Sequence, residues 1–414
     1  MKLGWILAGG LLGMSAFGAA ACAQDAKSGP WVMQQGGTTA SLRGIHAVGG
    51  GVAWASGTDG TVLRTEDSGY MWQTCAMPPG AEKLDFRGIW AWDANNAVIM
   101  ASGPGTQSRV YKTTDGCSHW KVVFSDPLPD GFFDALYFLD ADHGVLLGDP
   151  VKFNNNSHPI GSIESLIPPF ERRTGTLPIR VTNDGGYKWI PVMDGGPQPL
   201  TAGGKSGPVT GWKMNPPPGE GLTPLPDEAF FAASNSSIAS SGDTLWIGTS
   251  KGRVIRVSQA AFVPGGLICG TPEPISGSCP IHWQIVDSAQ TPIRHDSPAA
   301  GIFSIAFADW QHGIAVGGDY QKPNDPTGTA AWTADGGKTW TAAVKPPHGY
   351  RSSVAWDAEA KAWIAAGTNG SDISYDGGKT WSKLDDGNWN AISLPWIVGP
   401  KGRIAKLGAL PAKP

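Results

Sequence analysis

The chain has 414 residues, of which 58 are glycine, 34 proline and 19 tryptophan, and only 16% are charged. Abundant glycine, proline and tryptophan with little charge favours many short strands and tight turns over helices. The net charge is −4 and the sequence has no cluster of lysine or arginine, so we expect no nucleic-acid partner.

The first 23 residues have the pattern of an export signal. Lys2 gives the charged start, an apolar stretch runs from Trp5 to Phe17, and small residues follow. Cleavage after Ala23 would release a soluble form, either periplasmic or secreted, whereas cleavage before Cys22 would leave a lipid anchor on that cysteine. We favour the soluble form, because Ala-Cys-Ala is the better cleavage site. No later stretch is long enough to cross a membrane as a helix.

The rest of the chain reads as repeat units of short strands. Residues 31–35 are predicted to form one strand without a neighbour in sequence. The first two units then match closely: Phe86-Arg87-Gly88-Ile89 in the second corresponds to Leu42-Arg43-Gly44-Ile45 in the first. The fourth unit is expected to open with a strand from Phe230 to Ile238, and the seventh stops one strand short. The units are expected at residues 41–77, 84–126, 131–194, 228–288, 301–345, 351–385 and 389–408.

Five units contain the motif Ser/Thr-x-Asp-x-Gly-x-x-Trp, in which one copy has cysteine instead of glycine. The Asp carboxylate should accept hydrogen bonds from nearby backbone N–H groups, the glycine should supply a positive φ, and the tryptophan should anchor the next strand. We therefore predict that these aspartates build turns. They are Asp67, Asp115, Asp184, Asp335 and Asp376.

This motif resembles the Asp-box of the BNR-repeat β-propellers, a superfamily that holds sialidases, sortilin-type receptors and proteins like the photosystem II assembly factors. The resemblance implies an all-β fold: a signal peptide over residues 1–23, then one seven-bladed β-propeller over residues 24–414. Trp31–Gln35 would supply the strand that the seventh unit lacks, so we expect the amino terminus to pair into the last blade and close the ring. The box implies no function, because it is a structural turn in all of these proteins.

Besides Cys22, which is either removed or lipid-modified, the sequence has four cysteines, and an even number in an exported chain predicts disulfides. Cys269 and Cys279 lie ten residues apart in a loop rich in proline and glycine, and they are expected to close it. Cys75 and Cys117 would then join the first two blades.

Strand order predicts which face of the propeller carries a site. The box lies between the third and fourth strands of a blade, on one face. The links between blades and the turns between second and third strands emerge on the opposite face, here called the loop face. Insertions over residues 150–178, 193–228, 287–301 and 319–329 fall on the loop face, and binding sites usually lie on elaborated loops over a rigid scaffold.

Polar residues at the starts of first strands and the ends of second strands should reach the loop face near the central channel. The chain has few charged residues, so charged side chains at these positions are expected to have a role. They either pair across the channel and hold neighbouring blades together, or they bind a ligand. Both alternatives are open at this point. The predicted ligand-binding residues are Arg43, Arg87, Asp134, Asp149, Glu228, Arg294, Asp319 and Tyr320.

The motifs of metal and cofactor sites are missing from the sequence. The eight histidines do not have metal-ligand spacing, no acidic run resembles a calcium loop, and no glycine-rich phosphate cradle follows a strand. We therefore expect neither a metal nor a cofactor.

Three functions fit these features. The resemblance to the assembly-factor-like proteins implies a non-catalytic interaction scaffold that binds a protein partner or a carbohydrate on the loop face. The resemblance to sialidases implies a glycoside hydrolase, with Glu228, Asp149 and Tyr320 as candidate catalytic residues. We favour the scaffold, because the sialidase pattern Phe-Arg-Ile-Pro is not matched: the nearest stretch, Leu42-Arg43-Gly44-Ile45, has no proline.

The third function is binding of carbohydrate or peptide without turnover, through aromatic side chains on the loops. Trp212, Tyr320 and Tyr350 are the candidates for it. Most of the tryptophans, however, occur in strands or boxes, where packing in the core is the expected role.

Overall fold

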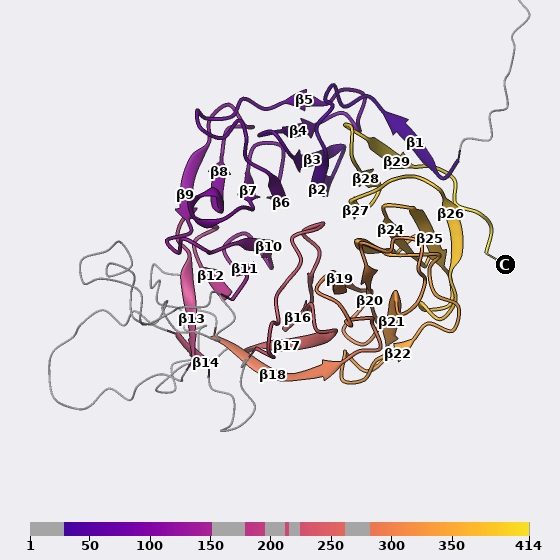
Figure 1. Ribbon diagram of the computed structural model, residues 1–414. Coiled ribbons are helices and arrows are strands. Elements are labelled where there is room, and N and C mark those ends of the chain that lie inside the picture. Colours follow the sequence, from indigo (N-terminus) through magenta and orange to yellow (C-terminus); the bar gives the residue numbers. More distant parts are fainter. Residues whose placement is uncertain (1–28, 151–178, 195–211, 215–223, 261–281, 414) are drawn as a thin grey trace, which may run out of the picture.

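The chain folds into seven sheets arranged in a ring, so the predicted seven-bladed β-propeller is confirmed (Figure 1). Among the described residues the one helical segment is a short 3-10 turn, Gly105–Gln107, and no helix there is long and apolar enough for a membrane span. The computed structural model describes residues 29–150, 179–194, 212–214, 224–260 and 282–413.

The first four strands of each blade pair antiparallel and follow one another from the central channel outward. Blade 1 contains β2 (Leu42–Gly49), β3 (Val52–Gly57), β4 (Val62–Thr65) and β5 (Gln73–Thr74). Blade 2 contains β6 (Phe86–Ala91), β7 (Ala97–Ala101), β8 (Arg109–Thr113) and β9 (Lys121–Ser125). Blade 3 contains β10 (Phe133–Phe138), β11 (Gly144–Gly148), β12 (Ile179–Thr182), β13 (Ile190–Asp194) and β14 (Trp212–Met214). Blade 4 contains β15 (Ile238–Ser241), β16 (Thr244–Gly248), β17 (Arg253–Ala260) and β18 (His282–Gln290).

The remaining blades follow the same plan. Blade 5 contains β19 (Ala300–Phe307), β20 (Gly313–Asp319), β21 (Ala330–Thr333) and β22 (Thr341–Ala342). Blade 6 contains β23 (Ser353–Asp357), β24 (Ala362–Gly367), β25 (Gly370–Ser374) and β26 (Ser382–Asp385). Blade 7 contains β27 (Ala391–Ser393), β28 (Trp396–Val398), β29 (Ile404–Leu407) and β1 (Trp31–Gln34).

The amino-terminal strand closes the ring, as predicted. Strand β1 pairs antiparallel with β29, and Trp31 lies opposite Leu407. The Trp31 indole is buried, lies 6.2 Å from the ring of Trp389, and donates its Nε1–H to Ser371 Oγ of blade 6 at 2.9 Å. Closure removes the open edge that blade 7 would otherwise expose.

The hydrophobic core is divided among the seven junctions between blades. Each of seven buried clusters in the described residues joins two neighbouring blades. At the first junction, for example, Trp54 of blade 1 packs with Phe86 and Tyr111 of blade 2. A single blade buries neither of its faces alone, so the ring is stable only when complete.

The five boxes form the expected turns. In the first, Asp67 Oδ1 accepts from the N–H of Met71 and from the hydroxyl of Thr65, which in turn accepts from the N–H of Gly69. Gly69 has φ +88°, the left-handed region that glycine adopts readily. The bond from Met71 is the first cause of the lowered pKa of the Asp67 carboxyl. The other four aspartates accept from an N–H four residues later in the same way.

The predicted disulfide between Cys75 and Cys117 is confirmed, and it joins the end of blade 1 to the box of blade 2. Cys117 stands in place of the box glycine and keeps its positive φ, at +66°. The predicted signal peptide, the possible anchor at Cys22 and the Cys269–Cys279 pair lie outside the described residues.

The predicted strand from Phe230 to Ile238 is wrong, because blade 4 begins only at Ile238. Residues 229–237, which we call the channel plug, instead leave the blade and reach the middle of the ring (Figure 1). Asn235 breaks the extended conformation with φ +59°. Its side chain accepts from the N–H of Leu136 in blade 3 at 2.7 Å and donates to the carbonyl of Ile89 in blade 2 at 3.3 Å.

Other polar contacts tie the plug to the opposite side of the ring. Ser234 Oγ donates to the carbonyl of Ser352 in blade 6 at 2.6 Å, and Ser236 Oγ donates to Ser304 Oγ of blade 5 at 2.7 Å. The plug therefore satisfies polar groups of four blades at the axis, where the first strands would otherwise face an open channel.

The insertion after blade 3 also differs from the prediction. Its residues Trp212–Met214 form β14, which pairs in parallel with β13 and adds a fifth strand to the outer edge of the blade. We had expected only a loop at 193–228. An outer strand has unpaired backbone groups, and a passing segment can satisfy them.

Ring closure predicts that Trp31 stabilises the whole domain. Trp31→Ala should lower the free energy of unfolding by about 3–5 kcal/mol, because a buried ring is lost from the closing seam. Met33→Ala on the same strand is the control; its side chain is 51% exposed, and it should change stability by less than about 0.5 kcal/mol. Thermal and urea unfolding measure both, and a Trp31→Ala protein as stable as the wild type would contradict closure by this strand.

The plug predicts a second stability effect. Asn235→Ala removes two hydrogen bonds and leaves a side chain in the left-handed region, so we expect a loss of about 2–3 kcal/mol. Asn235→Gly removes the same bonds but tolerates the positive φ, and it should lose less. Hydrogen exchange at the Leu136 amide should quicken in both variants, and unchanged exchange there would argue against the plug contact.

Candidate functional site

A cavity of about 560 Å³ lies over the channel plug, on the loop face. Its walls come from the starts of first strands, the ends of second strands and the links between blades, which all emerge on that face. Six blades contribute directly, and the plug contributes the segment that leads into blade 4. The cavity is lined by Arg43, Arg87, Phe132, Asp134, Asp149, Ala229, Phe230, Phe231, Ala232, Ala233, Pro298, Phe303, Tyr320, Tyr350, Ser352, Thr368 and Asn390.

A bulge in the inner strand supplies a cavity residue in four blades. The pairing register between first and second strands shifts at Arg43, Arg87, Asp134 and Phe303, so each has no direct partner on the neighbouring strand. A bulge turns the extra side chain away from its regular direction. All four of these residues line the cavity.

The glycines that follow the two arginines have a structural reason. A Cβ on Gly44 would lie 3.0 Å from the carbonyl oxygen of Arg87, and a Cβ on Gly88 would lie 2.9 Å from Asn235 Oδ1 of the plug. These close approaches require glycine at both positions. The shared Arg-Gly pair in blades 1 and 2 therefore reflects the packing of the inner strands against the next blade and the plug.

Arg43 and Arg87 form the cationic wall of the cavity around one carboxylate, Asp85. Arg87 Nε donates to Asp85 at 2.8 Å and its Nη1 donates to the plug carbonyl of Ala232 at 2.9 Å. Arg43 Nε lies 3.8 Å from Asp85, beyond hydrogen-bond distance, and this buried atom has no hydrogen-bond partner among the described residues. Burial lowers the pKa of the Arg43 guanidinium; the charge of Asp85 acts in the opposite direction.

Asp134 and Asp149 form a carboxyl pair beside the arginines. Asp134, in the bulge of β10, is fully buried, and it lines the cavity together with Asp149 at the end of β11. Burial, and then the charge of Asp149, raise the pKa of Asp134 well above its ordinary value, while Arg87 opposes them. Burial also raises the pKa of Asp149, against the effect of a 3.3 Å hydrogen bond from the plug N–H of Phe230. Two adjacent buried carboxyls hold a proton in this way because both cannot ionise cheaply.

Aromatic rings form the third wall. Phe231 of the plug stacks on Phe303 with ring centroids 3.8 Å apart, and Tyr350 meets Phe303 edge-on at 4.8 Å. Tyr320 is half exposed at the rim. Tyr350 is buried, which raises the pKa of its phenol. The cavity thus combines charge, hydrogen-bonding acids and an apolar surface.

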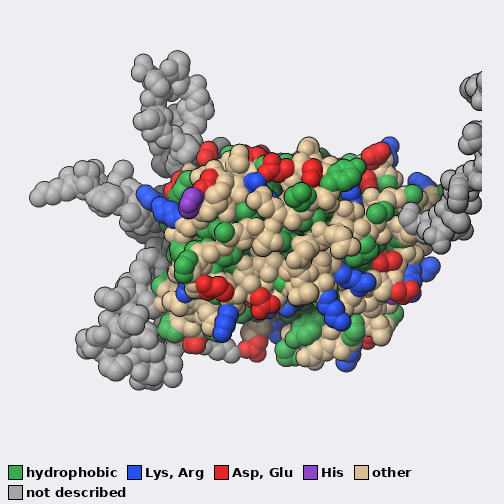
Figure 2. Space-filling view, turned by 90° about the horizontal axis from the view of Figure 1, so that it is seen from above, with side chains coloured by type: hydrophobic (Ala, Val, Ile, Leu, Met, Phe, Trp, Pro, Cys, Tyr) green, Lys and Arg blue, Asp and Glu red, His purple; other side chains and the backbone are tan. Residues whose placement is uncertain are grey.

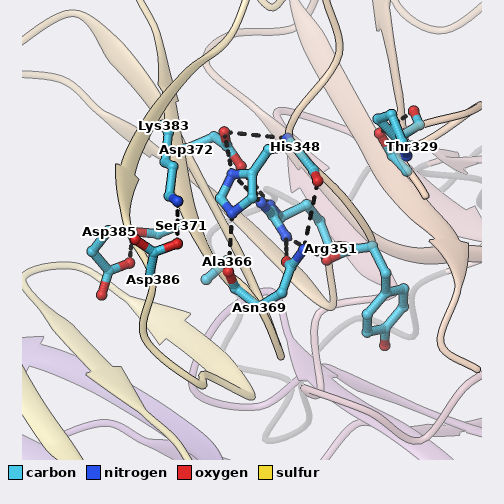
Figure 3. A network of polar contacts seen from close by, with 12 residues as sticks. Thr329, His348, Arg351, Ala366, Asn369, Ser371, Asp372, Lys383, Asp385 and Asp386 are labelled. Carbon is cyan, nitrogen blue, oxygen red and sulfur yellow. Dashed lines mark hydrogen bonds and ion pairs between the residues drawn. The ribbon is translucent and has the colours of Figure 1, made fainter. Parts of the chain in front are cut away.

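A buried polar network fixes the backbone at Tyr350 (Figure 3). Arg351 donates from Nε to Asp372 at 2.7 Å, and from Nη1 to the carbonyl of Tyr350 at 2.6 Å and to Asn369 Oδ1 at 2.5 Å. His348 lies between Asp372 Oδ1 and the carbonyl of Asn369, each at 2.9 Å. The network holds the aromatic wall on the rigid strands of blade 6.

Glu228, a predicted catalytic and ligand-binding residue, lies outside the cavity lining. Its side chain is fully buried, accepts from Arg253 Nε at 2.9 Å through Oε1, and contacts Arg253 Nη2 through Oε2. Oε2 also accepts from the N–H of Leu225 at 2.9 Å. These contacts anchor the start of the plug.

Arg294 and Asp319 also lie outside the cavity lining. Arg294 is ion-paired with Asp296 at 2.6 Å and with Asp325 at 2.5 Å. Asp319 is buried, and it accepts from the N–H of Gln321 at 3.0 Å and from the hydroxyl of Ser297 at 3.2 Å. Five of the eight predicted residues therefore meet in one cavity, and three have partners elsewhere.

Three residues of the site were not predicted from the sequence: Asp85, which contacts both arginines, and Phe231 and Phe303, which line the cavity. Phe303 follows the pattern of an apolar residue, the bulged residue, a small residue and an apolar residue: Ile302-Phe303-Ser304-Ile305 repeats Leu42-Arg43-Gly44-Ile45. An alignment of the inner strands by this pattern would have found it. Nothing in the sequence marks Phe231, because its place depends on the plug.

The surface outside the cavity has mixed charge. Figure 2 shows acidic and basic side chains interspersed over the visible side of the ring. In the part of the chain that the structure describes, no three His, Cys, Asp or Glu side chains are grouped as metal ligands.

Neither the protein-family models nor the curated proteins contain a match to this chain. Solved structures match the fold. The structure "YCF48 bound to D1 peptide" is 14% identical, covers 92% of this chain and 97% of its own, and has a TM-score of 0.53. The WD40 propeller domain of Doa1 is 10% identical, over 91% of this chain and 97% of its own, with a TM-score of 0.49. The likeness to the YCF48 structure concerns the fold alone.

A third similar structure is an ancestral GH74 enzyme. It is 13% identical, has a TM-score of 0.43, and its match covers 89% of this chain and 41% of that one. This chain therefore spans less than half of that protein.

The geometry of Glu228 predicts a role in folding. Glu228→Gln leaves Arg253 with an incomplete buried partner, so we expect a loss of about 3 kcal/mol in the free energy of unfolding. Glu359→Gln, at an exposed position, is the control and should leave stability unchanged. Urea unfolding measures both variants. A Glu228→Gln protein of wild-type stability would show that the ion pair contributes little.

Proposed function

We propose that this chain is an exported interaction scaffold that binds a carboxylate-bearing segment of a partner protein in the loop-face cavity. The observation that carries the proposal is the Arg43 guanidinium. It lines the cavity, 31% of its side chain is exposed, and it donates no hydrogen bond to another described residue. A guanidinium at a cavity wall can therefore take its acceptor from a ligand. A carboxylate is the natural acceptor for a guanidinium.

The two arginines have different roles in this proposal. Arg87 already bonds to Asp85 and to the plug, so it holds the floor of the cavity. Within the described part of the chain, the one polar contact of the Arg43 side chain is its 3.8 Å approach to Asp85, so Arg43 is the arginine available to a ligand. The aromatic wall then takes an apolar part of the same segment.

The comparison supports a peptide as the ligand. YCF48, a protein with this fold, is bound to a D1 peptide in its solved structure. At 14% identity the two proteins can be compared in fold alone. We therefore infer the ligand of this chain from its own cavity and do not assign it the D1 peptide. Export rests on the pattern of residues 1–23.

The geometry does not favour the glycoside hydrolase. Glycosidase carboxyls stand about 5–9.5 Å apart on either side of a sugar bond. Asp134 and Asp149 line the cavity, whereas the predicted catalytic residue Glu228 is fully buried and ion-paired with Arg253. Glu228 is therefore not available in the cavity as the nucleophile or the acid of a hydrolytic mechanism.

Arg43→Ala tests the proposal. Fluorescence anisotropy with a short glutamate-rich peptide should give a dissociation constant about tenfold or more higher than that of the wild type, as expected for one charge-assisted bond. Lys83→Ala removes an exposed charge that does not line the cavity, and it should bind as the wild type does.

A glutamine-rich peptide of the same length tests the chemistry of the ligand. It should bind wild-type protein weakly and should not distinguish Arg43→Ala from wild type. Equal binding of the glutamate-rich peptide by wild type and Arg43→Ala would contradict the proposal.

A further inference from the structure

The Asp134–Asp149 pair is not explained by the scaffold alone. Asp134 lies in the bulge of β10 and is 1% exposed, yet it lines the cavity. Its Oδ2 is buried and has no hydrogen-bond partner among the described residues. A regular strand without the bulge, or an apolar residue, would be the simpler way to build this wall.

The charged groups around the pair lie on three elements. Arg87 of β6 is the cation that acts on Asp134, and Arg43 of β2 stands beside Arg87. Asp85 is already shared by the two arginines. Just before the plug, Glu228 forms an ion pair with Arg253.

With one proton on the pair, the pair and Asp85 each carry one negative charge, and the two arginines balance them. A bound anion then meets no excess of negative charge. With the pair ionised, the same cavity has excess negative charge and repels an anion.

We propose that the Asp134–Asp149 pair is a proton-bearing subsite, which donates a hydrogen bond to the carboxylate of the bound segment beside Arg43 and makes its binding depend on pH. The inference rests on the proposed function. No bond other than hydrogen bonds is made or broken: the pair keeps its proton in the complex, and ionisation of the pair releases the proton to solvent and weakens binding. An acid and a carboxylate share a strong hydrogen bond, whereas two carboxylates repel.

The direction in which peptide binding changes with pH follows from the thermodynamic linkage between peptide binding and protonation of the pair. The pKa of Asp134 is raised in the folded protein by burial and by Asp149. Binding that needs the protonated pair is strongest below this raised value and falls above it, by up to about tenfold per pH unit, the limit for one linked proton.

The test is the pH profile of peptide binding. The glutamate-rich peptide is titrated against wild type and Asp134→Asn by fluorescence anisotropy from about pH 5.5 to 9, where the peptide's own carboxylates stay ionised. Wild-type affinity should fall as pH rises. Asp134→Asn keeps the shape of the neutral acid but cannot ionise, so its profile should be flatter and its affinity at high pH should exceed that of wild type.

Two further variants complete the design. Asp149→Asn keeps an oxygen that can accept from the N–H of Phe230 and should also flatten the profile, so it replaces Asp134→Asn if that protein does not fold. Asp243→Asn removes an exposed carboxylate in the turn between β15 and β16, and it should keep the wild-type profile.

Protein stability gives a second readout that needs no ligand. A carboxyl whose folded pKa is raised contributes stability that is present below its unfolded value and is lost as pH rises through the folded value. The melting temperature of wild type should therefore fall relative to Asp134→Asn as pH rises.

The outcomes separate the two proposals. Wild type that binds the peptide with a flat profile, or an Asp134→Asn protein that keeps the wild-type slope, overturns the proton-bearing subsite and leaves the scaffold intact. Wild type that binds no acidic peptide at any pH overturns both the scaffold and the subsite. In that case, the melting curves still report whether the pair holds a proton.

Discussion

The structure depends on how the axis of the ring is filled. Inner strands around a channel leave backbone groups without partners. The nine plug residues at the start of blade 4 bond to such groups in blades 2, 3, 5 and 6. Asn235 is central to this arrangement, because its one amide side chain bonds to blades 2 and 3 at once. The plug also forms the floor of the cavity, so the same contacts that stabilise the ring give the candidate site a rigid base.

The walls of the cavity depend on a second local device, the bulge near the start of the inner strand. In a regular strand, the side chains at these positions would alternate between the two faces of the blade and pack between neighbouring blades. One extra residue turns each of them toward the axis instead. Different blades use the same backbone feature for a cation, an acid or an aromatic ring. The repeated scaffold therefore carries a site with no repeat symmetry, and its chemistry is set by single residues.

The blade count and part of the cavity lining could be predicted from the sequence. The five boxes and the strand pattern of the two units without a box give seven blades, and the register of the strands finds Arg43, Arg87 and Asp134. The strand predicted from Phe230 to Ile238 is wrong because the segment begins with four apolar residues, as a buried strand does, but continues with polar residues that bond across the channel. The left-handed conformation of Asn235 is visible only in the structure. Glu228 was predicted as a site residue because it is a charged residue just before a predicted first strand. Its ion pair with Arg253 is a property of the folded chain. Partners distant in sequence, and the side chain directions that bulges set, are properties of the folded chain.

Hydrogen–deuterium exchange with and without the glutamate-rich peptide tests the central claim, that the plugged loop face is the binding face. The amides of the plug, of β2 near Arg43 and of residues 348–352 should be protected by the peptide. The box turns at residues 66–71 and 334–339 lie on the opposite face and should exchange as before. Protection of the box turns with no change at the plug would contradict the account.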